Sequence, residues 1–263
     1  MAAWVIGDIH GCFESLMALE AEILAADPYA KLVSVGDMID RGPNSNAVVE
    51  RFCSGPSHVA VMGNHEEFLL RVVAQERPDL MEGIALPRWL DTTDRVLRRK
   101  PRRLSMASVD DWRVNARLMW LLQGGSETVE SYGGVPSEPE TWQFPREHLE
   151  FIAALPLVWQ DEHQVVTHAL VNRADLNRLR GPASVPRDVA GRALWGRVPP
   201  EEAPDPARIH VSGHTVRGRV MRHPERRLVQ LDTGAYLGGH LTAYSAELEA
   251  VLTVGSHVMW EMA

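Results

Sequence analysis

The chain has 263 residues, of which 45% are hydrophobic, so it is long enough to bury a sizeable core. Its net charge of −8 argues against specific nucleic-acid binding and against binding to a membrane surface, because nothing overall attracts the chain to a polyanion. No apolar run approaches the roughly 20 residues that cross a bilayer. The N-terminus lacks a leader pattern, and the two cysteines, Cys12 and Cys53, are typical of free thiols, so we expect a cytoplasmic protein.

Short apolar runs rich in β-branched residues alternate with amphipathic helical patterns along the chain. The early part has the order strand, helix, strand, helix, strand, which favours a parallel sheet with helices packed on it. The helical patterns cover residues 13–26 and 45–52, and the predicted strands are 3–6, 32–35, 58–62, 164–167, 209–212, 227–231 and 241–245.

The first five of these strands end alike. Each apolar run gives way, directly or through a glycine, to Asp, Asn or His in the stretches GDIH, GDMIDRG, GNHE, THA and GHT. The carboxyl ends of strands line the ligand crevice of open α/β sheets, so we expect these polar side chains to meet at one rim. Glycine allows the tight turn or close backbone approach that such an exit from a strand requires.

Six of these side chains are candidate metal ligands, and together they offer carboxylate, amide and imidazole groups: Asp8, His10, Asp37, Asn64, His168 and His214. In an extended segment Asp8 and His10 would share a face and could share one ion. Asp37 has two oxygens and could bridge two ions. The mixed ligand set suits two divalent ions such as Mn²⁺, with Fe or Zn as alternatives, better than an all-oxygen Mg²⁺ or Ca²⁺ site. A single His or Asp at a strand end is more often structural, but the joint pattern favours a dinuclear site.

The other polar residues of these stretches suggest the chemistry. His65 follows Asn64 and, in an extended chain, would point across the site, where it could protonate a leaving oxygen. Asp40 could orient that imidazole, and Arg41 presents a planar group that suits phosphate oxygens. A hydroxide held between the two ions would attack the phosphorus directly, without a covalent intermediate. The sequence therefore predicts a metal-dependent phosphoesterase.

The blocks GDIHG, GDMIDRG and GNHE, in this order, resemble the signature blocks of the PPP-type calcineurin-like metallophosphoesterases, and the sequence is most similar to the bacterial and phage lambda type serine/threonine phosphatases. The resemblance implies an α/β fold of two facing mixed β-sheets flanked by helices, with a helical cap insertion. Asp8, His10 and Asp37 would hold one ion, and Asp37, Asn64, His168 and His214 the other. It further implies that His65 and Asp40 form an acid pair, and that Arg41, joined by Arg197 from ALWGR, binds phosphate.

The substrate is less well defined by the sequence. Asp40 in the second block and Glu66 in the third favour a serine/threonine protein phosphatase, whose substrate is a phosphorylated protein or peptide. A diadenosine tetraphosphate or other nucleotide hydrolase is the alternative, because the stretch QLDTGAYLGGHLTAYSAE resembles both groups. A non-catalytic phosphate-binding or scaffold protein is disfavoured, since a pure binder has no need of the predicted acid His65. The sequence makes no prediction about oligomeric state.

We expect residues 1–263 to form one metallophosphoesterase domain with a helical insertion at about 73–147, packed over the metal rim. The segment 95–103 within it carries six basic residues. A solvated surface is the simpler interpretation of this segment, and a patch that attracts anionic substrates is the alternative.

Overall fold

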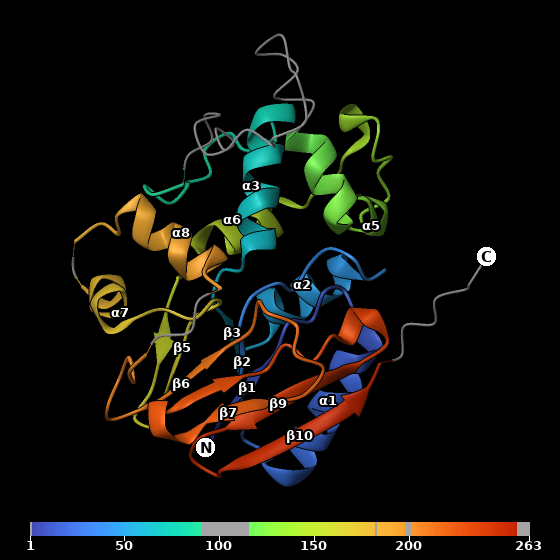
Figure 1. Cartoon of the computed structure of the whole chain (residues 1–263). Coiled ribbons are helices and arrows are strands. Elements are labelled where there is room, and N and C mark those ends of the chain that lie inside the picture. Colours follow the sequence, from blue (N-terminus) through green and yellow to red (C-terminus); the bar gives the residue numbers. More distant parts are fainter. Residues whose placement is uncertain (1, 91–115, 182, 198–200, 257–263) are drawn as a thin grey trace.

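The computed structural model describes residues 2–90, 116–181, 183–197 and 201–256 (Figure 1). The strands in these ranges form two mixed sheets of five strands each, in the orders β10-β9-β1-β2-β3 and β4-β5-β6-β8-β7. The strands are β1 (Ala3–Ile6), β2 (Lys31–Ser34), β3 (His58–Ala60), β4 (Trp159–Gln160), β5 (Gln164–Val166), β6 (Ile209–Ser212), β7 (Met221–His223), β8 (Leu228–Gln230), β9 (His240–Ser245) and β10 (Ala250–Gly255).

Strand β1 lies at the centre of the first sheet. It pairs in parallel with β2, where Val5 lies opposite Val33, and antiparallel with β9, where Val5 lies opposite Tyr244. In the second sheet, β5, β6 and β8 run parallel to one another, and β4 and β7 flank them antiparallel. The parallel strands of each sheet therefore end at one edge, as the sequence pattern requires.

Two apolar clusters hold the sheets and helices together. Because side chains alternate across a strand, Ala3 and Val5 point into a cluster shared with valines of the second sheet, whereas Trp4 and Ile6 point into the larger cluster that the helices cover. All four side chains are buried. The two sheets thus face each other through a thin valine-rich layer, which fixes the distance between their strand ends.

The helices flank these layers. They are α1 (Phe13–Ala26), α2 (Ser45–Ser54), α3 (Asn64–Glu76), the π-helix η2 (Leu121–Gly125), α5 (Ser126–Ser131), α6 (Arg146–Ala154), α7 (Arg173–Arg180) and α8 (Arg187–Trp195), with single 3₁₀ turns at η3 (Pro139–Thr141), η4 (Pro224–Arg226) and η5 (Ala235–Leu237). Figure 1 shows α3, α5, α6, α7 and α8 gathered beyond one end of the sheets, and α1 behind β9 and β10.

The predicted fold class is confirmed, and all seven predicted strands occur with ends within two residues of the prediction. Strands β4, β7 and β10 were not predicted. Both cysteines are free, Cys12 buried and Cys53 half-buried. The predicted basic segment 95–103 lies outside the described residues. Of the helices that the structure describes, none combines the length and the apolar character that crossing a membrane requires.

Candidate metal centre

The loops that leave the strands have an unusual backbone at the predicted site residues. Seven non-glycine residues have positive φ in the described part of the chain, and five of these are predicted site residues: His10 (47°), Asp37 (51°), Asp40 (70°), Arg41 (72°) and His214 (67°). The left-handed region is costly for residues with a Cβ, of the order of 1–3 kcal/mol each, and such residues concentrate at functional sites. The surrounding fold therefore imposes this backbone in order to aim these side chains.

Four of the six predicted ligands converge in one cluster. The Nε2 atom of His168 lies 2.8 Å from Oδ1 of Asn64, 3.1 Å from Nδ1 of His214 and 3.4 Å from Oδ1 of Asp37. The Nδ1 atom of His214 lies 2.9 Å from the same Asn64 oxygen. These are the four residues expected to hold one of the two ions, and all four are buried.

The chemistry of this cluster fits a cation. Nδ1 of His168 lies 2.9 Å from the carbonyl oxygen of Val35, a bond that requires the proton on Nδ1 and leaves a lone pair on Nε2. That lone pair faces the amide oxygen of Asn64 and the carboxylate of Asp37. Three hydrogen-bond acceptors therefore point at one another with no proton between them. Such an arrangement is repulsive by itself and favourable around a divalent cation. Burial and neighbouring positive charge also lower the pKa of His214 to about 3, which keeps its ring neutral and able to bind metal.

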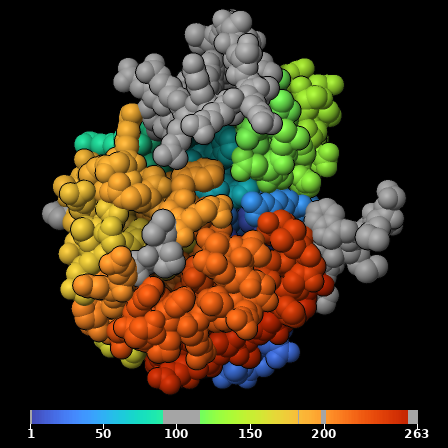
Figure 2. Space-filling model, in the orientation of Figure 1, coloured from blue at the N-terminus to red at the C-terminus, as the bar shows by residue number. Residues whose placement is uncertain are grey.

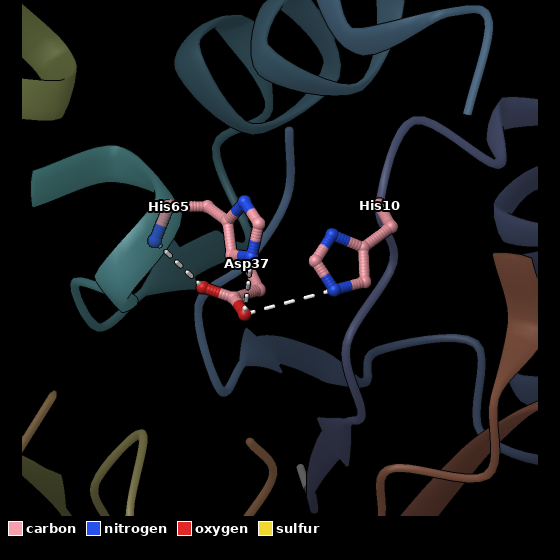
Figure 3. A group of neighbouring side chains, drawn as sticks. All are labelled: His10, Asp37 and His65. Carbon is pink, nitrogen blue, oxygen red and sulfur yellow. Dashed lines mark hydrogen bonds and ion pairs between the residues drawn. The ribbon is translucent and has the colours of Figure 1, made fainter. Parts of the chain in front are cut away.

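The second cluster shares Asp37 with the first. Figure 3 shows His10, from the loop after β1, and His65, from α3, on either side of Asp37. Nε2 of His10 lies 3.6 Å from Oδ2 of Asp37. Nδ1 of His10 lies 2.8 Å from the carbonyl oxygen of Ile39, so Nε2 again presents its lone pair to the site. Asp37 therefore stands between two groups of potential ligands, as a bridging carboxylate would.

Asp8 departs from the predicted arrangement. The segment that contains Asp8 and His10 is not a regular extended strand as predicted, because β1 ends at Ile6 and His10 has a left-handed backbone. The carboxylate of Asp8 is buried and accepts the backbone N–H of His214 at 3.0 and 3.1 Å. A Cβ on Gly213 would lie 1.8 Å from this carboxylate, so only glycine fits there. Asp8 thus lies at the rim between the two sheets, and its role as a ligand remains a prediction.

His65 and Asp40 form the predicted pair. Nδ1 of His65 lies 2.6 Å from Oδ2 of Asp40, and both side chains are buried. Burial lowers the pKa of His65, but the negative charges of Asp37 and Asp40 outweigh it and raise the pKa above its ordinary value. The raised pKa favours the protonated form of the imidazole, which is the form that can act as an acid.

The expected extended conformation of Asn64 and His65 is wrong. These residues open helix α3, with Gly63 as its N-cap. They point apart because successive helical residues are rotated by about 100°, and not because of strand alternation. Glu66 caps the helix by accepting the N–H of Gly63 at 2.9 Å, and its carboxylate also accepts the N–H groups of Asp37 and Met38 at 2.9 and 2.7 Å. The glutamate of GNHE thus joins the second and third sequence blocks.

Two residues of the predicted insertion hold Asp40, and the sequence did not identify them. The indole Nε1 of Trp120 donates to Oδ2 of Asp40 at 2.9 Å, and Oγ1 of Thr128 donates to Oδ1 at 2.6 Å. Both side chains are fully buried. Sequence separations of 80 and 88 residues hide these contacts from pattern analysis. Both carboxylate oxygens of Asp40 therefore accept hydrogen bonds from the predicted insertion, in addition to the contact of Oδ2 with His65.

Arg41 lies over the centre, whereas Arg197 lies at its edge. The guanidinium of Arg41 is 2.6 Å from Nε2 of His10 and 3.0 Å from Nε2 of His65, and it stacks 4.3 Å from the ring centroid of Tyr236. Arg197 follows α8 and is exposed, and its positive charge contributes to the lowered pKa of His214. The structure thus places Arg41 among the predicted ligands, and phosphate binding by Arg197 remains a prediction.

Asp232 is a further acidic residue of the centre that the sequence analysis missed. It follows β8 as the other site residues follow their strands, and it is buried. Burial and the nearby charge of Asp37 raise its pKa to about 6. The same strand-end pattern that identified the other residues could have identified Asp232.

Comparisons with known proteins agree with this geometry. Residues 1–241 match the family described as calcineurin-like phosphoesterase. The chain is 30% identical to a symmetrical bis(5'-nucleosyl)-tetraphosphatase of Acidovorax sp. (strain JS42), over 92% of this chain and 91% of that protein. It is 44% identical to serine/threonine-protein phosphatase 1 of Salmonella typhimurium, over only 30% of this chain and 38% of that protein. A crystal structure named as a candidate diadenosine tetraphosphatase has the same fold, with a TM-score of 0.57 and 18% identity over 98% of this chain and 94% of that one.

Proposed function

The chain belongs to the calcineurin-like phosphoesterases and is a metallophosphoesterase of the PPP type, and from this premise we propose that it hydrolyses dinucleoside tetraphosphates. The observation that supports this substrate is similarity along nearly the whole chain to symmetrical bis(5'-nucleosyl)-tetraphosphatases, of which the protein from Dechloromonas aromatica (strain RCB) is 27% identical over 97% of this chain. The sequence alone ranked this substrate second.

The family implies divalent metal ions, and the residues fit them. Asn64, His168 and His214 would hold one ion, His10 the other, and Asp37 both. The family resemblance adds Asp8 to the ion that His10 would hold. When bound, two divalent ions activate water and stabilise negative charge on the phosphoryl group. We take Mn²⁺ as the first ion to test, because the ligands mix oxygen with imidazole nitrogen.

The chain's own residues would bind the substrate and move its proton. Arg41 presents two N–H groups at the centre and would pair with phosphate oxygens. His65 would donate its proton to the departing oxygen, and Asp40 would hold the imidazole in position and stabilise its charge. Because Trp120 and Thr128 fix the carboxylate of Asp40, this positioning needs no rearrangement.

A phosphomonoester of serine or threonine is the second candidate substrate. Departure of a nucleoside diphosphate places charge on phosphate oxygens and needs little protonation, whereas departure of an alcohol needs a proton from an acid. The paired His65 and Asp40 therefore favour an alcohol as leaving group, as does the 44% identity to the Salmonella phosphatase over the 82 residues compared.

Side-by-side turnover by the Mn²⁺-loaded protein separates the candidates. We expect kcat/KM for diadenosine tetraphosphate to exceed that for a phosphoserine peptide, with ADP as the product. The reverse order would replace the nucleotide proposal by the phosphatase one. The His65→Asn variant adds a second comparison, because it should slow release of an alcohol far more than release of ADP.

A further inference from the structure

We propose that a cavity beside Arg41 is a subsite for the nucleobase of the substrate. The inference rests on the proposed function, because it names the part of a nucleotide that this region would hold. The cavity has a volume of about 420 Å³ and is lined by Arg41, by Leu122, Gln123 and Glu127, and by Tyr236 and Leu237. This volume lies within the range of roughly 300–1,000 Å³ typical of small-molecule sites.

The cavity adjoins the metal centre because the two share Arg41. Gly124 brings the wall that contains Leu122 and Glu127 against Arg41: its carbonyl accepts the N–H of Arg41 at 3.0 Å, and a Cβ on Gly124 would lie 2.3 Å from that nitrogen. Gly124 has a φ of 108°, a backbone conformation that glycine adopts at low cost and that other residue types rarely adopt. A phosphate held by Arg41 would therefore have this cavity directly beside it.

The opposite wall comes from η5, far along the chain. Tyr236 lies under the guanidinium of Arg41 on one side and contacts the ring of His10 edge-on, which fixes its ring. On the face shown in Figure 2, the green surface around residues 116–131 and the orange-red surface of the residues around 230–240 lie on either side of a strip of blue. The two walls thus belong to one face of the molecule.

The lining fits a neutral, flat and partly polar group. Leu122 and Leu237 are 74% and 61% exposed, which is high for large apolar side chains, and a heterocycle between them would remove this surface from water. The amide of Gln123 and the carboxylate of Glu127 can hydrogen-bond the polar edge of a base. The negative charge of Glu127 disfavours a further phosphate or an acidic peptide side chain. A nucleobase fits this lining, because it has apolar faces and a polar edge and carries no negative charge.

Calorimetry with the Mn²⁺-loaded protein tests the subsite without depending on turnover. The probes are adenosine 5'-monophosphate and methyl phosphate, which carry the same phosphomonoester group and differ in the nucleoside. We expect the nucleotide to bind at least tenfold more tightly, and the double variant Leu122→Ala, Leu237→Ala to reduce this preference by roughly tenfold. Leu248→Ala is the matched control, because Leu248 is 50% exposed in the turn between β9 and β10, outside the cavity.

Equal affinity for the two probes in the wild type, or an unchanged preference in the double variant, would overturn the subsite. The proposed function is tested separately by turnover of diadenosine tetraphosphate. Preference for the nucleotide probe without cleavage of the dinucleotide would support the subsite and contradict the proposed function. Cleavage of the dinucleotide without this preference would support the proposed function and contradict the subsite.

Discussion

Replacing Trp120 by Phe should impair the protonation step while leaving the metal centre intact. The change keeps the buried aromatic ring and removes the N–H that donates to Asp40 at 2.9 Å. Asp40 retains the bond from Thr128, so its carboxylate stays in place but is less firmly held against His65. A hydrogen bond to a charged group contributes about 1.5–3 kcal/mol, and each 1.36 kcal/mol is tenfold in rate, so we expect a loss of roughly 10- to 100-fold wherever His65 acts as an acid.

The leaving group decides whether that loss appears. Phenyl phosphate releases a phenol with a pKa of about 10, which needs a proton, whereas dinitrophenyl phosphate releases a far more acidic phenol that does not. The kcat of Trp120→Phe should therefore fall by the roughly 10- to 100-fold given above for phenyl phosphate, and by much less for the dinitrophenyl ester. An equal loss on both esters would refute the reasoning, because it would indicate general damage to the site.

Trp142→Phe is the matched control for this experiment. Trp142 is also buried, and its ring lies edge-on to Trp120 at a centroid distance of 5.7 Å. Its Nε1 donates to the backbone oxygen of Val135 at 3.0 Å and has no bond to Asp40. The control variant should lose stability comparable to that lost by Trp120→Phe, as measured by thermal unfolding, and should show the same kcat ratio between the two esters as the wild type.

Three other changes test the site and its support. Asp37→Asn should abolish turnover and reduce the number of bound Mn²⁺ ions, measured by metal analysis after gel filtration; full metal occupancy would contradict a bridging role. Burial alone would raise the pKa of Glu20, but its ion-pair partners lower it to about 2, so its contribution to stability is present above about pH 4.5 and is lost as the pH falls towards 2. Glu20→Gln should flatten the dependence of the unfolding midpoint on pH in this window, whereas Glu22→Gln, an exposed change on the same helix, should not. Gly124→Ala should destabilise the protein by about 1–3 kcal/mol in chemical denaturation and weaken substrate binding, because its Cβ would displace Arg41; an unchanged KM would argue against that displacement.

The sequence predicted the part of the site that local patterns encode. His10, Asp37, Asn64, His168 and His214 each follow a strand, and parallel strands bring their carboxyl ends to one edge, so proximity could be inferred without coordinates. The strands themselves were found because β-branched runs between glycines and polar residues are a local signal. Strand β7, with the sequence MRH, is short and mostly polar and gives no such signal.

The remaining parts depend on contacts that no local pattern contains. Trp120 and Thr128 reach Asp40 only through the folding of an 80-residue intervening segment. The helical start at Asn64 gives only a weak local signal, because Glu66 can accept the N–H of Gly63 but glycine has no side chain to complete a capping box. The left-handed backbone at His10 and Arg41 could not have been predicted, since it is imposed against the preference of these residues.

The place of β9 in the sheet has a consequence for how the protein is made. Strand β1 is synthesised well before β9, its antiparallel neighbour, which begins at residue 240. His214 is likewise synthesised long after His10 and Asp37. A nascent chain, which emerges N-terminus first, can therefore bring His10, Asp37 and His65 together early, but it lacks His168 and His214, the other partners of Asp37, until those residues have emerged. The cluster of Asp37, His168 and His214 is therefore completed only after residue 214 has been synthesised, and a chain interrupted before β9 would present an open edge of β1 to other nascent chains.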